Sequence, residues 1–252
     1  MKTIPRMLRT IGVEAVRRYN RLVVTVAQPL PDRPVLFVAN HGFGGIVDLN
    51  LLAFAAAYDD MGSTRELTAL THQMVWSLRV GGLVEPFGAR PANRREALGA
   101  FRAGGNVLVF PGGDTDALKS WTERNEIVFS GRCGFARLAM EADVPVVPVV
   151  TAGAGETLYA ASSGRRLASA LGVDKALRLS SLPVTVSIPW GINIGFVGLL
   201  PYFPLPSKLK TSVLAPMEAR DGETAEIFAA RIEKAMQVEL NRLTKNRIPI
   251  LG

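Results

Sequence analysis

The sequence predicts an α/β fold, a single layered domain with a largely parallel central sheet flanked by helices and with amphipathic helices at both termini. Short apolar runs typical of buried strands alternate along the chain with segments of helical spacing. Strands that alternate with helices form mostly parallel sheets, because each helix crosses back over the sheet. With 252 residues, 48% of them hydrophobic and 20% charged, the chain can bury one sizeable core. We therefore expect one domain over residues 1–252.

The N-terminal segment, residues 1–30, is basic and amphipathic. Its apolar residues recur at helical spacing and arginines stand between them. The apolar set is Leu8, Ile11, Val13, Val16 and Leu22, and the arginines are Arg9, Arg17, Arg18 and Arg21. Two interpretations stay open. The helix packs on the domain with its arginines in solvent, or it lies on anionic lipid, where each basic residue adds about 1 kcal/mol.

The core of the domain is expected over residues 35–216. The run "VLFVAN" predicts a buried strand that ends at His41, and "DLNLLAFAAAYDD" predicts a helix with Asp48 as its N-cap. The pattern repeats as helix "NRREALGAFRAGG", strand "NVLVF", loop "PGGDTD", helix "GRCGFARLAMEAD" and strand "VPVVPVV". Two prolines place the last strand near an edge or at a strand end. Ligands gather beyond the C-terminal ends of such strands, where "NHGFGGIVD" and "PGGDTD" both fall.

Between Leu179 and Ser207 the chain carries no charged side chain, which is long enough for a membrane span. Five prolines interrupt this stretch, and each removes a backbone donor that a lipid-exposed helix needs. We therefore predict a buried strand followed by an apolar surface loop, with the 189–206 part forming that surface. The final segment, 221–246, predicts an amphipathic helix. Its apolar face is Ile227, Phe228, Ile232, Met236, Leu240 and Leu243.

Composition limits the partners. The net charge of +7 favours an anionic partner such as nucleic acid, lipid headgroups or a phosphorylated substrate. Scattered basic residues without a recognition helix or an aromatic platform disfavour nucleic acid. Cys133 is the single cysteine, which rules out an intramolecular disulfide, and two histidines, His41 and His72, disfavour a metal site. Charges interrupt the apolar residues near the N-terminus, so we expect no secretion and a cytoplasmic protein.

Common catalytic motifs are missing, and this absence directs attention to His41. The sequence holds no dinucleotide fingerprint, no phosphate-binding loop with a closing lysine and no G-x-S-x-G elbow. A histidine that is hydrogen-bonded to a carboxylate can remove a proton from a hydroxyl, and no protein nucleophile is then needed. The alternative is a histidine that caps a helix or fills a polar pocket, with Asp48 serving only as the N-cap.

Four sequence blocks in order resemble the glycerolipid acyltransferase family, which is related to lysophosphatidic acid acyltransferase, and within it the branch like monoacylglycerol and diacylglycerol acyltransferases. The resemblance runs from about Val35 to Pro216. The first block is "VANHGFGGIVD", the second and third lie in "GARPANRREALGAFRAGGNVLVFPGGDTDALK", and the fourth is "GRCGFARLAMEADVPVVPVVTAGAGE". The tail of the fold is "PWGINIGFVGLLPYFPLPSKL". One departure is the six residues between His41 and Asp48 where the family has four, which places Ile46 at the expected acid. Three glycines, Gly42, Gly44 and Gly45, can bulge this turn.

The resemblance implies an O-acyltransferase that needs no cofactor and takes acyl-CoA or acyl-carrier protein as co-substrate. His41, paired with Asp48, would deprotonate an acceptor hydroxyl, which then attacks the thioester. Pro111, Gly112 and Gly113 would form the loop at the acceptor, with the two glycine N–H groups as candidate donors to the oxyanion. Many relatives carry a glutamate where Gly112 stands.

Phosphate binding and location are also implied by the resemblance. Arg90 and Arg94 lie where the family's second block carries an arginine that binds phosphate. We expect a lipid acceptor, a membrane surface, no nucleic acid, and a place on the inner face of the membrane. Two alternatives stay open: transfer to a neutral lipid alcohol such as mono- or diacylglycerol, and a non-catalytic lipid-binding protein that keeps the fold.

Overall fold

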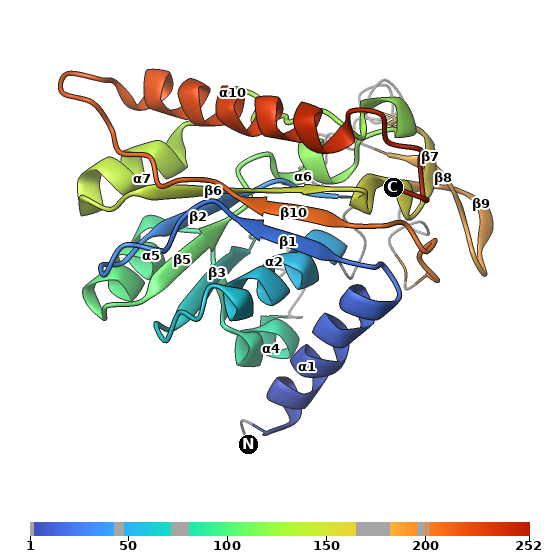
Figure 1. The fold of residues 1–252 in the computed structure, drawn as a ribbon, viewed down its shortest axis with the longest axis horizontal. Helices are drawn as coiled ribbons and strands as arrows, with labels where there is room; N and C mark the ends of the chain where they lie inside the picture. The colour runs from blue at the N-terminus through green and yellow to red at the C-terminus, as the bar shows by residue number, and fades with distance from the viewer. Residues whose placement is uncertain (1–2, 43–47, 72–80, 165–181, 196–199, 201) are drawn as a thin grey trace.

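A seven-stranded sheet in the order β1-β10-β6-β2-β5-β3-β4 forms the centre of the protein (Figure 1). The computed structural model describes residues 3–42, 48–71, 81–164, 182–195, 200 and 202–252. Every neighbouring pair of strands is parallel except β10 and β6. The prediction of a largely parallel sheet is therefore confirmed. The strands are β1 (Val23–Val26), β2 (Leu36–Ala39), β3 (Leu67–Thr71), β4 (Ala89–Pro91), β5 (Asn106–Val109), β6 (Val146–Ala152) and β10 (Lys210–Val213).

Helices cover both faces of this sheet. In Figure 1, α7 and α10 lie above it, and α1, α2 and α4 lie below it. The bounds are α1 (Thr3–Arg18), α2 (Leu49–Asp60), α4 (Gly81–Val84), α5 (Arg94–Arg102), α6 (Gly113–Ala117), α7 (Gly134–Ala142) and α10 (Ala225–Thr244). Short 3-10 turns are η1 (Glu85–Phe87), η2 (Trp121–Glu123) and η3 (Ala154–Glu156). One hydrophobic cluster joins α5, α7 and α10 to the sheet, and a second joins α2 to its other face.

Strand β2 is buried on both faces, which explains its unbroken apolar sequence. Leu36 and Val38 contribute to the cluster under α7 and α10, while Phe37 and Ala39 contribute to the cluster over α2. This alternation is the two-residue period of a strand. The strand therefore carries His41 out at its C-terminal end, at the edge where a ligand is expected.

Three sequence predictions need correction in the central domain. Strand β6 lies inside the sheet between β10 and β2, not near an edge. The register with β10 begins at Val149, one residue after Pro148, so the missing proline N–H lies beyond the residues paired with β10, while Pro148 itself pairs with Val38 of β2. The N-terminal helix ends at Arg18, and Leu22 instead precedes strand β1. Ile227 is exposed on α10, because the buried stripe of this helix runs through Phe228.

Helix α1 packs on α2 through the buried side chains of Val13 and Val16. Arg9 and Arg17 form ion pairs with Asp59 and Asp60 at the end of α2, with nitrogen-to-oxygen distances of 2.6 Å in both pairs. These two arginines are thus tied to the domain and not simply solvated.

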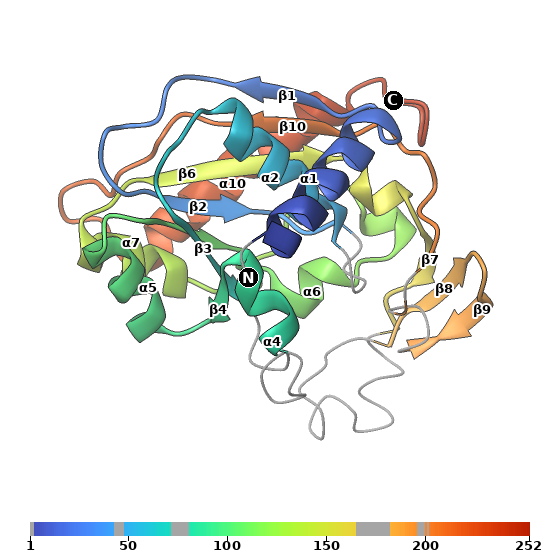
Figure 2. The same cartoon turned by 90° about the horizontal axis from the view of Figure 1, so that it is seen from below.

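A second, three-stranded antiparallel sheet stands at one side of the molecule (Figure 2). Its strands are β7 (Tyr159–Ser162), β8 (Val184–Ser187) and β9 (Gly191–Ile194). The prediction of a buried strand followed by a loop is wrong here, because β8 and β9 form a hairpin whose apolar side chains are largely exposed. No helix in the described part of the chain is long and apolar enough to cross a membrane.

Candidate active site

His41 and Asp48 are in direct contact despite the lengthened loop between them. The His41 Nδ1 lies 2.6 Å from Asp48 Oδ2, and the two side chains are 19% and 12% exposed. The other carboxylate oxygen, Oδ1, accepts the Asn50 N–H at 2.8 Å and so caps α2. Asp48 is therefore the helix cap and the histidine partner at once. Ile46, which occupies the expected position of the acid, lies outside the described residues.

The ring of His41 is fixed in orientation as well as in place. Phe110, which follows β5, stacks on it with ring centroids 4.5 Å apart. Because Asp48 holds Nδ1, the ring nitrogen left to take a proton from a substrate is Nε2. A carboxylate on Nδ1 also stabilises the imidazolium that forms when Nε2 gains that proton. The arrangement has the geometry of a general base with its orienting acid.

Buried amides hold the end of β2 that carries His41. The Asn40 side chain accepts the Thr151 N–H at 2.9 Å and donates to the Thr151 carbonyl at 3.1 Å, which ties β2 to β6. Asn50 of α2 donates to the Asn40 carbonyl at 2.6 Å. Gly42 must be a glycine, because a Cβ there would lie 2.4 Å from the Ala154 Cβ. The backbone on both sides of His41 is therefore constrained.

A buried ion pair fastens the His41 backbone to α6. The His41 N–H donates to Asp116 Oδ2 at 2.7 Å, and Lys119 Nζ donates to Asp116 Oδ1 at 2.7 Å. Both charged side chains are almost fully buried. Lys119 Nζ also donates to the Glu126 carbonyl at 2.5 Å. Sequence reasoning missed this pair; its signal is an acid and a lysine at i and i+3 in "DALK", within a segment that otherwise looks like a solvated polar extension.

The loop of Pro111, Gly112 and Gly113 follows Phe110, which stacks on His41, and Arg132 binds the backbone of this loop. Arg132 Nη1 donates to the Pro111 carbonyl at 3.2 Å and also to the Gly112 carbonyl. The Gly113 N–H donates to the Phe110 carbonyl at 3.2 Å, so it serves the turn. Of the two predicted oxyanion donors, this leaves the Gly112 N–H as the candidate.

Gly112 has no room for a side chain. A Cβ at this position would lie 2.2 Å from the Asp116 Cβ and 2.5 Å from the Val128 carbonyl oxygen. The carboxylate that anchors His41 thus occupies the space beside Gly112 on α6. A glutamate cannot stand here while Asp116 keeps this position.

The structure places Arg90 and Arg94 in ion pairs of their own. Arg94 on α5 binds both carboxylate oxygens of Glu141 on α7, and its side chain is 71% exposed. Arg90 lies 3.3 Å from Glu85 Oε1 and donates to the Ala89 carbonyl at 2.9 Å. Neither contact brings a guanidinium to His41 or to the 111–113 loop. Their role in binding phosphate stays a prediction, and His72 lies outside the described residues.

Tyr202 is a further side chain at the site that the sequence did not single out. It packs against Leu118 and Leu158. Burial raises the pKa of its hydroxyl to about 12; a hydrogen bond with Thr157 opposes this shift, and the Asp48 carboxylate adds to it. Tyr202 therefore remains a neutral phenol within electrostatic reach of Asp48.

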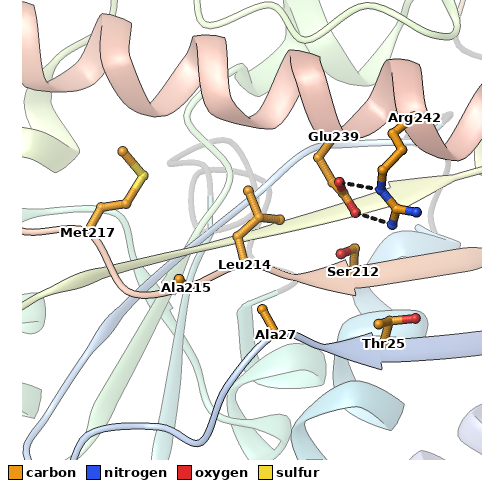
Figure 3. A pocket seen from close by; sticks show the side chains of 8 residues that line it. All are labelled: Thr25, Ala27, Ser212, Leu214, Ala215, Met217, Glu239 and Arg242. Carbon is orange, nitrogen blue, oxygen red and sulfur yellow. Dashed lines mark hydrogen bonds and ion pairs between the residues drawn. The ribbon is translucent and has the colours of Figure 1, made fainter.

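A separate groove lies far from this site. It has a volume of about 470 Å³ and runs between α10 and strands β1 and β10 (Figure 3). Its lining residues are Thr25, Ala27, Ser212, Leu214, Ala215, Met217, Glu239 and Arg242. None of them belongs to the loops that carry His41 or Gly112, so we assign no part of the reaction to this groove.

Residues 21–152, which include His41, Asp48 and the 111–113 loop, match the acyltransferase family model. An uncharacterized protein of Mycobacterium tuberculosis is 27% identical over 238 residues, which is 90% of this chain and 63% of the relative. The "DGAT1/2-independent enzyme synthesizing storage lipids" of Gallus gallus is 24% identical over 219 residues, covering 86% of this chain and 58% of the relative. The chain thus spans less than two thirds of the length of these relatives.

One solved structure shares the fold. It is the 1-acyl-sn-glycerophosphate (LPA) acyltransferase PlsC from Thermotoga maritima, with a TM-score of 0.55 and 15% identity. The similarity covers 95% of this chain and 80% of that one. At this identity the match establishes the likeness of fold.

Proposed function

Because this chain belongs to the acyltransferase family, we propose that it moves a fatty acyl group from a thioester to a hydroxyl of a glycerolipid or lysoglycerolipid. The observation that carries the proposal is the 2.6 Å contact between His41 and Asp48 beside the 111–113 loop. The donor is acyl-CoA or acyl-carrier protein, and no metal or cofactor takes part. The reaction takes place at a membrane surface, on the inner face of the membrane, because the acceptor and the acylated product are both lipids.

The reaction runs through one tetrahedral intermediate. The acceptor O–H gives its proton to His41 Nε2 while its oxygen attacks the thioester carbonyl. The Gly112 N–H stabilises the oxyanion that forms. Collapse of the intermediate breaks the C–S bond, and the imidazolium donates its proton to the leaving thiolate. Asp48 stabilises the imidazolium throughout, and no acyl-enzyme forms.

The test is acyl transfer from labelled acyl-CoA by matched variants. His41→Ala should lower kcat by about 10² to 10⁴-fold, the usual contribution of a general base. Asp48→Asn should lower kcat by about 10²-fold or more, because an amide favours the wrong tautomer. The control is Asp59→Asn, an exposed acid at the other end of α2 that should leave kcat unchanged. Full activity in His41→Ala would refute the mechanism.

A neutral lipid alcohol is the second candidate acceptor. Gly112 stands where many relatives have a glutamate, and the packing of Asp116 leaves no space for a side chain at Gly112. Arg90 forms an ion pair with Glu85, and Arg94 forms an ion pair with Glu141. The storage-lipid relative of Gallus gallus favours the same choice by its name. A panel of monoacylglycerol, diacylglycerol, a long-chain alcohol and lysophosphatidate with one labelled acyl-CoA distinguishes the acceptors. Preference for lysophosphatidate that is lost in Arg90→Ala would overturn the neutral-acceptor proposal.

A non-catalytic lipid-binding role predicts a different result from the same experiments. Such a protein binds vesicles and transfers no acyl group to any acceptor on the panel. The contact of a base with its orienting acid at 2.6 Å argues against it, because binding alone requires no such pair.

A further inference from the structure

We propose that the outer face of the β7–β8–β9 sheet inserts into a lipid bilayer and places the His41 site at the membrane surface. The inference rests on the proposed function in one respect, namely that the acceptor is a lipid. It goes further by assigning the contact to a defined surface. We call this surface the outer face; its residues are Tyr159, Val184, Val186, Ile188, Ile192, Ile194 and Phe203.

The side-chain pattern of the hairpin is inverted relative to an ordinary soluble sheet. Along β8 the polar residues Thr185 and Ser187 point inward and are buried, while Val186 between them is exposed. The Thr185 hydroxyl is buried without a hydrogen-bond partner in the described part of the chain. On β9, Ile192 is 79% exposed. A sheet face in water normally carries polar side chains outward, so this face is built for an apolar medium.

The register makes these exposed side chains one continuous surface. Val186 pairs with Tyr159 of β7 on one side and with Ile192 of β9 on the other. Directly opposed residues in an antiparallel sheet point to the same face. The bridge between Ile188 and Phe203 extends the face by one more pair, and Phe203 is 70% exposed. Contiguous apolar patches of this kind mark protein or membrane contacts.

Charge and aromatic residues around the outer face favour a membrane. Residues 182–206, which supply β8, β9 and Phe203, contain no Asp, Glu, Lys or Arg. Beside Tyr159, Trp121 packs at a ring distance of 5.4 Å, and Arg124 lies 4.8 Å above the Trp121 ring. Three residues after Phe203, the Pro206 carbonyl accepts a hydrogen bond from the exposed Arg21 at 2.7 Å. An apolar centre edged by Trp, Tyr and Arg matches the depth profile of a bilayer interface.

The inner side of the same sheet leads to the active site. Strand β7 follows β6, which runs parallel to β2, so the small sheet stands at the sheet edge that carries His41. Tyr202 packs inward on Leu158 and Ala160, while its neighbour Phe203 belongs to the outer face. Two consecutive residues, Tyr202 and Phe203, therefore connect the surroundings of Asp48 with the outer face.

Vesicle binding tests the inference without any measurement of activity. The probe is a series of vesicles of phosphatidylcholine with phosphatidylglycerol, and binding is measured by flotation. Ile192→Ser/Ile194→Ser should weaken partitioning by about tenfold or more, because two large apolar side chains leave the membrane. The matched control, Ile227→Ser/Val238→Ser, removes two comparably exposed apolar residues from α10 and should leave partitioning unchanged.

A second measurement uses the folded wild-type chain, so that a misfolded variant does not decide the question. Trp190 lies in the hairpin turn and is exposed, and bromine-labelled lipids should quench its fluorescence. The variant Trp190→Phe should lose this quenching. Unchanged partitioning of the Ile192→Ser/Ile194→Ser variant would overturn the proposal. So would self-association of the wild-type chain in solution that this variant abolishes, because the face would then contact a second copy of the chain. Vesicle binding through this face without acyl transfer would overturn the proposed function and leave the membrane contact standing.

Discussion

Asp116→Asn is expected to destabilise the protein strongly, although Asp116 contacts His41 only through the His41 backbone N–H. The substitution removes the negative charge and leaves the Lys119 ammonium buried with the Glu126 carbonyl as its remaining partner. Breaking a buried ion pair in this way costs about 3–5 kcal/mol. The asparagine oxygen can still accept the His41 N–H, so the loss reports on the charge and not on that hydrogen bond.

Urea unfolding measures this cost, as a lower midpoint at unchanged m value. The double variant Asp116→Asn/Lys119→Met removes both charges and should recover most of the lost stability, because no unpaired charge remains. Asp59→Asn, which breaks the exposed pair with Arg9, should cost about 1 kcal/mol or less. A double variant as unstable as the single one would refute the argument, since the cost would then not come from the stranded ammonium.

The remaining predictions concern Gly112, Glu156 and Gly42. Gly112→Glu should unfold the 111–113 loop and abolish transfer, measured by thermal melting and acyl transfer, while Gly99→Ala, where a Cβ meets open space, should be tolerated. Burial alone would raise the pKa of Glu156, but hydrogen bonds from Arg247, the Ile250 N–H and Ser207 hold this pKa below its ordinary value of 4.5. Glu156→Gln should therefore destabilise the protein at neutral pH. The difference in stability between the variant and the wild type should disappear as pH falls through the folded-state pKa. Gly42→Ala should lower kcat by displacing His41, and an unchanged kcat would contradict the close contact with Ala154.

Much of the central sheet could be predicted because its signals are local. The runs that form β2, β5 and β6 and the helices α2, α5 and α7 carry their period and their caps in the sequence. The position of β6 in the sheet could not be predicted, because proline favours an edge on average and only the register with β10 shows why Pro148 is tolerated. The sequence predicts a buried strand at β8 and β9 because apolar side chains normally point inward, whereas those of this hairpin are largely exposed.

The site was predicted in part for a similar reason. His41 and the 111–113 loop lie at strand ends, which the sequence marks. The Asp116 and Lys119 pair is invisible to local patterns, since two charges in a polar segment look solvated until the fold buries them. Arg132 holds the loop across twenty residues of chain, and no spacing rule reveals such a contact.

The lengthened loop between His41 and Asp48 does not decide whether they meet, because the loop does not set their positions. His41 is placed by the end of β2, and Asp48 is placed as the N-cap of α2. Strand and helix are locked together independently of the loop, through the packing of Phe37 on Phe54 and through the Asn50 bond to the Asn40 carbonyl. Any loop long enough to join these two points leaves the pair intact. Six intervening residues therefore preserve the contact between His41 and Asp48, and the element that sets it is the start of α2.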